Sequence, residues 1–178
     1  MRYCDTRKLI FFFPARTGST TFDYLLEEFG TKRIRDMHRH EFPKTILEAY
    51  PKFADYKRYG FFRNPLDRFI SAVRHIKKNP HPMMEGISFK DYPRVADPKF
   101  FAKQVDTLEG CELLDFDNYD AEIAKIADLF GYKRTLFIPK SNTSSDVTVE
   151  VDNDTTEFVR DYYAGDYKLA LDVFNKTY

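Results

Sequence analysis

The feature that most constrains the fold is a strongly apolar run near the start of the chain, KLIFFF at residues 8–13, followed at once by small and polar residues. A continuous apolar run of this length is typical of a central parallel strand that is buried on both faces. Large apolar residues then recur with helical spacing, and they are Phe22, Leu25, Leu26 and Phe29. Gly30 stands where such a helix would end. Residues 8–30 are therefore predicted to form a strand, a loop and a helix.

A second unit of the same kind is predicted at residues 57–78. The segment KRYGFF, 57–62, is apolar enough for a buried strand, with Gly60 as a mild defect. Asn64 and Pro65 come next, and Asn is a favoured helix N-cap while Pro is favoured at the first helical position. Large apolar residues then continue with helical spacing to about Lys78. The sequence therefore predicts a second strand, loop and helix.

The rest of the chain continues this alternation. Strands are predicted near Arg33 and at 111–116 and 135–138, and helices are predicted at 44–50, 119–130 and 167–176. Asp154 and Glu157 have the spacing of a capping box with Asp in the cap role, so another helix is predicted to begin there. Residues 79–98 are rich in proline and are predicted to be irregular. Alternating strands and helices indicate an α/β fold with a largely parallel sheet, and 178 residues suit a single domain, 1–178.

The charge distribution narrows the class of ligand. The formal net charge is zero, so no overall charge argues for binding to nucleic acid or to a membrane. Residues 31–80 nevertheless hold 13 Lys and Arg against 5 Asp and Glu, whereas residues 106–178 hold 7 against 16. A basic half in a neutral chain favours an anionic small ligand or an anionic acceptor. Mutual attraction of the two halves explains the same pattern, and both interpretations stay open.

The cysteine content and the first residues indicate a cytoplasmic protein. The two cysteines, Cys4 and Cys111, are fewer than small secreted domains usually carry, so both are expected to be reduced thiols. The apolar stretch 9–13 is too short for a transmembrane helix or for the apolar region of a signal peptide. We therefore expect a cytoplasmic location and no membrane partner.

The loop PARTGST, residues 14–20, has the composition of an anion-binding site. Backbone N–H groups at the start of a helix have no partner within the helix, and they point at the mouth of the loop. Small and hydroxyl-bearing residues suit this role, and the candidates are Thr17, Gly18, Ser19, Thr20 and Thr21. Arg16 adds a fixed positive charge whose fork geometry matches phosphate or sulfate oxygens. The loop lacks the Walker A pattern, and the alternative is an ordinary strand–helix turn rich in small polar residues.

A second candidate phosphate site follows the strand predicted at 57–62. Arg63 comes directly after this strand, and Ser71 lies two turns into the next helix. In open α/β sheets, ligands bind at the carboxyl ends of the strands. An Arg at the strand end and a Ser on the helix can hold one phosphate from two sides. The alternative is that Arg63 is merely a neighbour of the helix and that Ser71 is solvated.

Together, the two motifs resemble those of the sulfotransferases that use 3′-phosphoadenosine 5′-phosphosulfate (PAPS), especially the carbohydrate, glycosaminoglycan-type branch. Residues 14–20 are similar to the 5′-phosphosulfate loop of that family. Residues 63–71, RNPLDRFIS, match its 3′-phosphate motif R-[ND]-P-x-x-R-x-x-S without a gap. The motifs occur in the family's order, and the resemblance covers residues 8–78. It implies a three-layer, P-loop-like parallel sheet flanked by helices.

The resemblance also implies which residues bind the cosubstrate PAPS and its product PAP. Arg16 and the 17–21 loop would hold the 5′-phosphosulfate, while Arg63 and Ser71 would hold the 3′-phosphate. Lys140 follows the strand predicted at 135–138 and is a further candidate to approach the nucleotide.

Two departures from the family's pattern lie in the first motif. Ala15 is an insertion relative to the usual spacing, and Arg16 replaces the Lys that is common in the family. An Arg can stabilise charge on the bridging oxygen, which would give Arg16 a catalytic role, but it is a poor proton donor.

The segment MHRHE, residues 37–41, supplies candidates for the general base. Sulfuryl transfer needs a group that helps to deprotonate the acceptor, and the ordinary pKa of His lies near neutrality. One glycosaminoglycan branch of the resembled family carries H-x-H here with the second His as base, which implies His40 first, His38 second and Glu41 third. Two alternatives stay open: a metal site built on the His pair, for which the spacing signals no further ligand, and a solvated basic loop.

The resemblance thus predicts an enzyme that moves a sulfuryl group from PAPS to a hydroxyl or amine of a saccharide or other small molecule, without a metal. The chain is short for that family, so we expect a small or exposed acceptor, or a homodimer that completes the cleft. The alternatives are an ATP-dependent kinase for a nucleotide or small molecule, and a nucleotide-binding domain without catalytic activity. The missing Walker lysine counts against the kinase.

Overall fold

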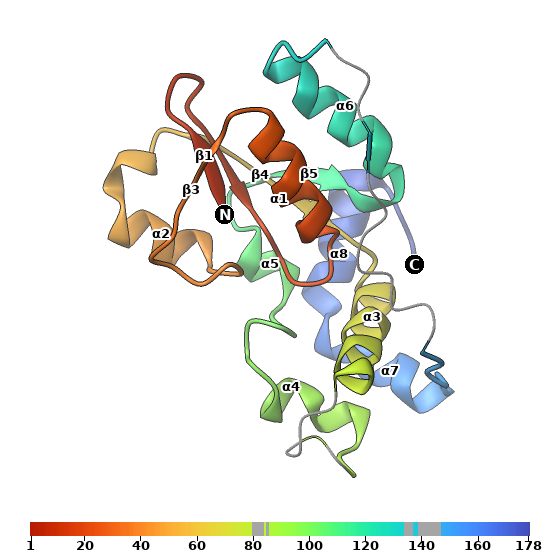
Figure 1. The fold of residues 1–178 in the computed structure, drawn as a ribbon. Helices are drawn as coiled ribbons and strands as arrows, with labels where there is room; N and C mark the ends of the chain where they lie inside the picture. The colour runs from red at the N-terminus through yellow and green to blue at the C-terminus, as the bar shows by residue number, and fades with distance from the viewer. Residues whose placement is uncertain (80–83, 85, 134–136, 139–146) are drawn as a thin grey trace.

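Five strands form one mixed sheet in the order β3-β1-β2-β4-β5 (Figure 1). The computed structural model describes residues 1–79, 84, 86–133, 137–138 and 147–178. The strands are β1 (Arg2–Cys4), β2 (Leu9–Phe12), β3 (Lys32–Arg33), β4 (Lys57–Phe62) and β5 (Glu112–Asp115). Strands β2, β4 and β5 pair in parallel, whereas β1 pairs antiparallel with both β2 and β3. The predicted α/β class is confirmed, with a parallel core and an antiparallel margin.

Two helices follow the two strands that the sequence marks most strongly. Helix α1 (Ser19–Glu28) follows β2, and α3 (Pro65–Lys78) follows β4, as predicted. The predicted Asn64 cap of α3 is confirmed, because its side-chain oxygen accepts hydrogen bonds from two first-turn N–H groups. The remaining helices are α2 (Pro43–Ala49), α4 (Tyr92–Val95), α5 (Gln104–Thr107), α6 (Tyr119–Leu129), α7 (Asn153–Tyr162) and α8 (Ala164–Phe174). Short 3₁₀ turns are η1 (Pro51–Phe53), η3 (Phe89–Asp91) and η4 (Phe116–Asn118).

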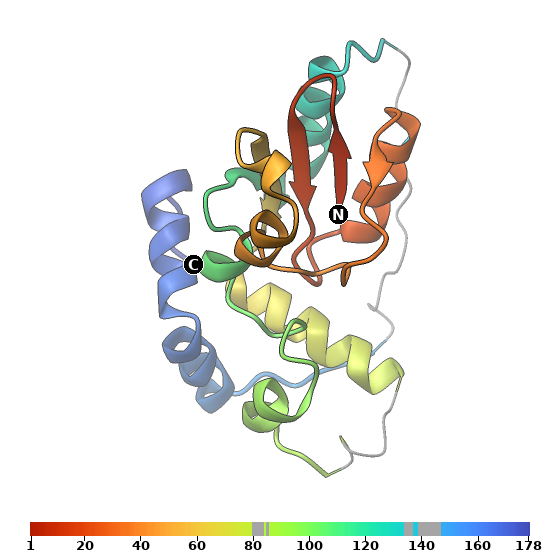
Figure 2. The same cartoon turned by 90° about the vertical axis from the view of Figure 1, so that its left-hand side faces the viewer.

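The alternation of side chains along β2 explains why helices cover both faces of the sheet. Phe11 points into a buried cluster with side chains of α1 and α6, including Phe22 and Ile123. Phe12, the next residue, points into a cluster on the other face with Ile46 of α2 and residues of η1. Figure 2 shows α1 and α2 on opposite sides of the β1–β2 hairpin. Because successive residues of a strand face opposite ways, the all-apolar run produces the three layers that the resemblance implied.

A separate packed region lies beyond the carboxyl edge of the parallel strands. Helices α3, α4 and α7 gather there, away from the β1–β2 turn (Figures 1 and 2). Their buried side chains form one cluster around Phe69, Val73, Val159 and Tyr163. This region therefore fixes α3, whose N-terminus faces the ends of β2 and β4.

Two sequence-based predictions need correction. Asp152, not Asp154, caps α7: the Asp152 carboxylate accepts a hydrogen bond from the Thr155 N–H at 2.7 Å, so the helix begins earlier. Asp154 lies in the first turn, where a negative charge also suits the helix dipole. The strand predicted at 135–138 lies partly outside the described residues, and its described part, Phe137 and Ile138, is not in a strand.

Two further features concern the cysteines and the membrane. Cys4 and Cys111 are both free thiols, as expected. Among the described residues, no helix combines the length and the apolar character needed to cross a bilayer.

Candidate functional site

The two sequence motifs meet at the carboxyl edge of the sheet. Strands β2 and β4 are parallel neighbours in register, with Phe12 opposite Gly60. Each strand therefore ends beside the other, and the loops that follow, residues 13–18 and 63–64, start from adjacent points. In open α/β sheets, ligands bind beyond the carboxyl ends of adjacent strands.

The loop after β2 has an unusual backbone. Arg16 has φ of 65° and Gly18 has φ of 69°, both in the left-handed region. The Thr17 hydroxyl donates a hydrogen bond to the Pro14 carbonyl at 2.8 Å, which closes the turn between them. A non-glycine residue in the left-handed region costs on the order of 1–3 kcal/mol, and such strain is concentrated at ligand sites. Arg16 is thus held in a strained conformation by its surroundings.

Gly18 is required on two counts. Its positive φ disfavours any side chain, and a Cβ there would lie 2.9 Å from Cε2 of Tyr119 and 3.1 Å from Cε2 of Phe116. The Tyr119 hydroxyl also donates a hydrogen bond to the Gly18 carbonyl at 3.2 Å. The two aromatic rings therefore hold the loop backbone at a fixed distance. Sequence reasoning did not single out either ring.

The N-terminus of α1 has features that suit a bound anion. Gly18 is its N-cap, and within the described residues no side chain caps this helix and no acidic residue lies in its first turn. Orphan N–H groups and the positive end of the helix dipole favour a bound negative charge at such a terminus. Thr17 and Thr21 are buried there, Ser19 is half-buried and Thr20 is exposed. The predicted loop residues are therefore grouped at one helix N-terminus.

Arg16 and Arg63 converge on the same cluster. The Arg16 Nε donates a hydrogen bond to the Ser71 Oγ of α3 at 3.1 Å, and its Nη1 lies 3.4 Å from Nδ1 of His75. The Arg63 Nη1 donates a hydrogen bond to the Arg16 carbonyl at 3.0 Å. Burial lowers the pKa of both guanidinium groups, yet arginine stays charged in proteins. The predicted residues Arg16, Arg63 and Ser71 thus form one contiguous cationic site.

The backbone of Arg63 is fixed by the buried side-chain amide of Gln104. The Gln104 side chain accepts a hydrogen bond from the Arg63 N–H at 2.9 Å and donates one to the Arg63 carbonyl at 2.8 Å. Asp166 in turn accepts hydrogen bonds from the N–H groups of Gln104 and Val105, both at 2.9 Å. The Arg63 guanidinium lies 4.7 Å above the ring of Phe116. These contacts orient Arg63, and sequence reasoning missed both Gln104 and Asp166.

Arg68, the other basic residue of the second motif, connects parts of the fold. It is fully buried, donates a hydrogen bond to the Ala102 carbonyl at 2.6 Å and lies 5.1 Å above the ring of Tyr163. The Tyr163 hydroxyl donates a hydrogen bond to the Phe101 carbonyl at 2.8 Å. Arg68 therefore joins α3 to the segment before α5.

His40 lies against the start of the loop. Its Nδ1 is 2.6 Å from the carbonyl oxygen of Phe13, the residue after β2. A carbonyl only accepts hydrogen bonds, so Nδ1 carries the proton and Nε2 keeps its lone pair in the neutral ring. Burial lowers the His40 pKa from its ordinary 6.5 to about 4, and the contact with Phe13 only partly offsets this effect. His40 is therefore neutral near pH 7, with Nε2 able to accept a proton.

The other two candidate bases have different surroundings. His38 is exposed, its Nδ1 accepts a hydrogen bond from the His40 N–H at 3.2 Å, and its Nε2 lies 3.7 Å from Oδ2 of Asp97. The Glu41 carboxylate is largely buried and forms a 2.5 Å ion pair with Nζ of Lys99. The other Glu41 oxygen accepts a hydrogen bond from the Phe42 N–H at 3.3 Å, so both oxygens are already engaged, which favours His40 over Glu41.

Arg39 connects the histidine segment to the phosphate loop. It donates a hydrogen bond to the Ser19 carbonyl at 2.7 Å, and its guanidinium lies 5.7 Å above the ring of Phe13. The histidine segment, residues 37–41, forms a turn, with the rings of His38 and His40 5.6 Å apart.

In the part of the chain that the structure describes, no group of three or more His, Cys, Asp or Glu side chains is placed to bind a metal. Lys140, the remaining candidate, lies outside the described residues.

Comparisons with known proteins gave one structural likeness. No family model matches the chain, and no curated protein matches it. A crystal structure of a sulfotransferase from Alicyclobacillus acidocaldarius superposes with a TM-score of 0.45 and 19% sequence identity. The superposition covers 76% of this chain and 60% of that one, so the chain spans less than two thirds of that protein's length.

Proposed function

We propose that the chain is a sulfotransferase that takes the sulfuryl group from PAPS. One observation carries this proposal: Arg16 and Arg63 come from the ends of two adjacent strands and meet at one site with Ser71. A ligand with an anionic group at each end needs two such cationic groups, one from each strand end. PAPS has a 5′-phosphosulfate and a 3′-phosphate, which fit this requirement.

The residues present can hold both anionic ends. The N-terminus of α1 and Arg16 offer N–H donors and a positive charge for the 5′-phosphosulfate. Arg63 and the Ser71 hydroxyl offer donors for the 3′-phosphate, and Gln104 fixes the backbone from which Arg63 extends. The Thr17 hydroxyl is already used within the loop, so we assign Thr17 to the site through its backbone.

The proposed chemistry needs a base and a charge stabiliser. PAPS, when bound, supplies a sulfuryl group on a good leaving group. The proton of the acceptor hydroxyl or amine passes to Nε2 of His40 while the bond from the acceptor to sulfur forms. As the bond from sulfur to the bridging oxygen breaks, Arg16 stabilises the charge on that oxygen. A bound anion beside His40 raises the pKa of its imidazole above that of the free protein, which makes the ring a stronger base.

The acceptor is proposed to be a saccharide or another small molecule. The surroundings of the three candidate bases favour His40, with His38 next, because Glu41 is paired with Lys99. A cytoplasmic location and a homodimer stay predictions from the sequence.

The direct test compares two nucleotides. PAP should raise the melting temperature of the protein, because it presents both phosphates, whereas ATP with magnesium should give a smaller shift. The opposite order would support a kinase and overturn the proposal. Transfer from labelled PAPS to a panel of saccharides, phenols and amines then separates an enzyme from a domain that only binds nucleotide.

A further inference from the structure

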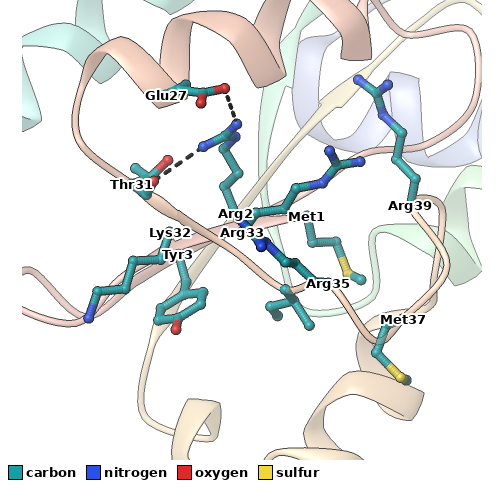
Figure 3. A pocket seen from close by; sticks show the side chains of 11 residues that line it. Met1, Arg2, Tyr3, Glu27, Thr31, Lys32, Arg33, Arg35, Met37 and Arg39 are labelled. Carbon is teal, nitrogen blue, oxygen red and sulfur yellow. Dashed lines mark hydrogen bonds and ion pairs between the residues drawn. The ribbon is translucent and has the colours of Figure 1, made fainter.

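A second pocket lies at the antiparallel margin of the sheet and has no role in the proposed binding of PAPS. Its volume is about 690 Å³, within the range of small-molecule sites. Figure 3 shows the side chains around it. We call it the basic pocket, and its lining residues are Met1, Arg2, Tyr3, Glu27, Thr31, Lys32, Arg33, Ile34, Arg35, Met37 and Arg39.

The lining of the basic pocket is strongly cationic. Five lining side chains are Lys or Arg and one, Glu27, is acidic. Arg2 is neutralised by Asp23 and Glu27, both at 2.5 Å. Lys32 is paired with Asp5 outside the pocket, at 3.0 Å. The other three basic side chains, Arg33, Arg35 and Arg39, therefore give the pocket its positive charge.

Two arginines of the basic pocket have no charged partner among the residues that the structure describes. Arg33 and Arg35 are exposed, and within the described residues neither forms an ion pair or side-chain hydrogen bond. Arg39 is paired more loosely, since its Nη2 lies 3.5 Å from Oδ2 of Asp23, and its buried Nε has no hydrogen-bond partner in the described part of the chain. Three guanidinium groups therefore offer donors toward one cavity.

The basic pocket adjoins the proposed site of transfer. Arg2 is opposite Phe11 of β2 and also opposite Arg33 of β3, so the pocket lies beside the carboxyl end of β2. Arg39 lines the pocket while it binds the Ser19 carbonyl, and the next residue, His40, contacts Phe13. In the sheet order, β4 with Arg63 flanks β2 on one side, and β1 and β3 with the pocket flank it on the other.

We infer that the basic pocket binds an anionic group of the acceptor, a carboxylate or a sulfate or phosphate ester on a small molecule. Guanidinium groups match these oxyanions in geometry and in charge, and an anion beside Arg33 and Arg35 would receive donors that no described residue uses. Binding there would bring the rest of the acceptor toward His40. The role as an acceptor site rests on the proposed sulfotransferase function, whereas the binding of anions by the pocket does not.

The test is calorimetric titration of the PAP-saturated protein, because PAP occupies the phosphate loop and leaves the basic pocket as the anion site. The probes are inorganic pyrophosphate, glucose 6-sulfate and, as the neutral match, glucose. Pyrophosphate and glucose 6-sulfate should bind, and glucose should bind at least about tenfold more weakly than its sulfate ester. The double variant Arg33→Ala/Arg35→Ala should weaken both anions about tenfold to a hundredfold and leave PAP affinity unchanged.

A matched control removes the same charge elsewhere. Arg94 and Arg160 are exposed and lie outside the pocket, so Arg94→Ala/Arg160→Ala should leave anion binding unchanged. The inference is overturned if neither anion binds to the PAP-saturated protein, if glucose binds equally well, or if the control variant loses as much affinity as the pocket variant.

The two proposals fail in different ways. Absence of PAP binding overturns the proposed function, and the pocket is then tested with pyrophosphate alone on the unliganded protein. In that experiment the Arg33→Ala/Arg35→Ala variant should lose affinity and Arg63→Ala should keep it. The reverse pattern would place the anion at the phosphate loop and overturn the basic pocket.

Discussion

The chain contains two strand–loop–helix units, β2–α1 and β4–α3, that look alike in sequence and end differently. The N-terminus of α3 is closed: the Asn64 side chain accepts hydrogen bonds from Leu66 N–H at 2.8 Å and Asp67 N–H at 3.3 Å, and Asp67 adds an acid to the first turn. The N-terminus of α1 begins at Gly18 with neither feature among the described residues. The second unit caps its helix with a side chain, whereas the first begins its helix at a glycine in the left-handed region.

The difference extends to the backbone. The loop of the first unit holds Arg16 and Gly18 in the left-handed region. The end of the second unit has no positive φ at Arg63 or Asn64, and Gln104 binds the Arg63 backbone at both its N–H and its carbonyl. Strain in the first unit and a buried clamp in the second indicate different tasks. This contrast fits the proposal that the first unit surrounds an anion, while the second holds one oriented guanidinium group.

The largest effect is expected at His40, which contacts the first unit through Phe13. His40→Ala should lower turnover about 10²–10⁴-fold, because a positioned base contributes that much, and should leave PAP affinity nearly unchanged. His38→Ala is the matched control and should have a smaller effect. Steady-state rates with labelled PAPS and PAP titrations measure both. Unchanged turnover in His40→Ala would mean that another group is the base.

Gly18→Ala tests whether the first loop needs its backbone conformation. The Cβ would meet the rings of Tyr119 and Phe116 at a φ of +69°, so we expect a loss of unfolding free energy of about 1–3 kcal/mol and at least tenfold weaker PAP binding. Gly30 is the control: its φ is +78°, but a Cβ there has nothing within 4 Å. Gly30→Ala should therefore cost stability alone. Equal PAP affinity in both variants would argue against a ligand role for the loop.

Acid should destabilise the protein through His40, which the first unit holds neutral. The folded protein holds its pKa at about 4, below the ordinary 6.5, so the unfolded chain binds the proton first as the pH falls. The free energy of unfolding should then fall from pH 6.5 toward pH 4, by on the order of 2 kcal/mol. Urea unfolding of the wild type and of His40→Gln at several pH values measures this. If both lose stability equally over this range, His40 is not the cause.

The smallest effect is expected at the cap of the second unit. Asn64→Ala removes a side-chain cap and should lower the free energy of unfolding by about 1 kcal/mol. PAP affinity should change little, because the cap satisfies the helix rather than the ligand. Thermal unfolding with and without PAP measures both quantities. A large loss of PAP affinity from this variant would erase the contrast between the two units.

Local patterns in the sequence predicted the parts of the site that local physics controls. The apolar runs 8–13 and 57–62 predicted buried strands, and Asn64 predicted a capped helix, because strand burial and capping depend on nearby residues. The two sequence motifs also identified Arg16, Arg63 and Ser71 as candidate phosphate-binding residues, and the structure places these three side chains close together. Their ligand-binding roles stay a prediction.

Contacts between distant residues could not be predicted from such patterns. Gln104 reaches Arg63 from 41 positions away, and Asp166 reaches Gln104 from 62 positions away. Lys99 neutralises Glu41 across 58 positions, so the order of the candidate bases depends on packing that no local signal contains. Strand β1 has only three residues and too short a pattern to identify. Its antiparallel pairing forms the margin that carries the basic pocket.

The most direct test of the account separates the two ends of the nucleotide. The wild type and the variants Arg16→Ala and Arg63→Ala would be titrated with PAP, with adenosine 5′-monophosphate and with adenosine 3′-monophosphate. Arg63→Ala should weaken PAP and the 3′-monophosphate about tenfold to a hundredfold and spare the 5′-monophosphate, and Arg16→Ala should show the opposite preference. If both variants weaken both monophosphates equally, or neither changes any affinity, the two strand ends do not hold the two ends of one ligand.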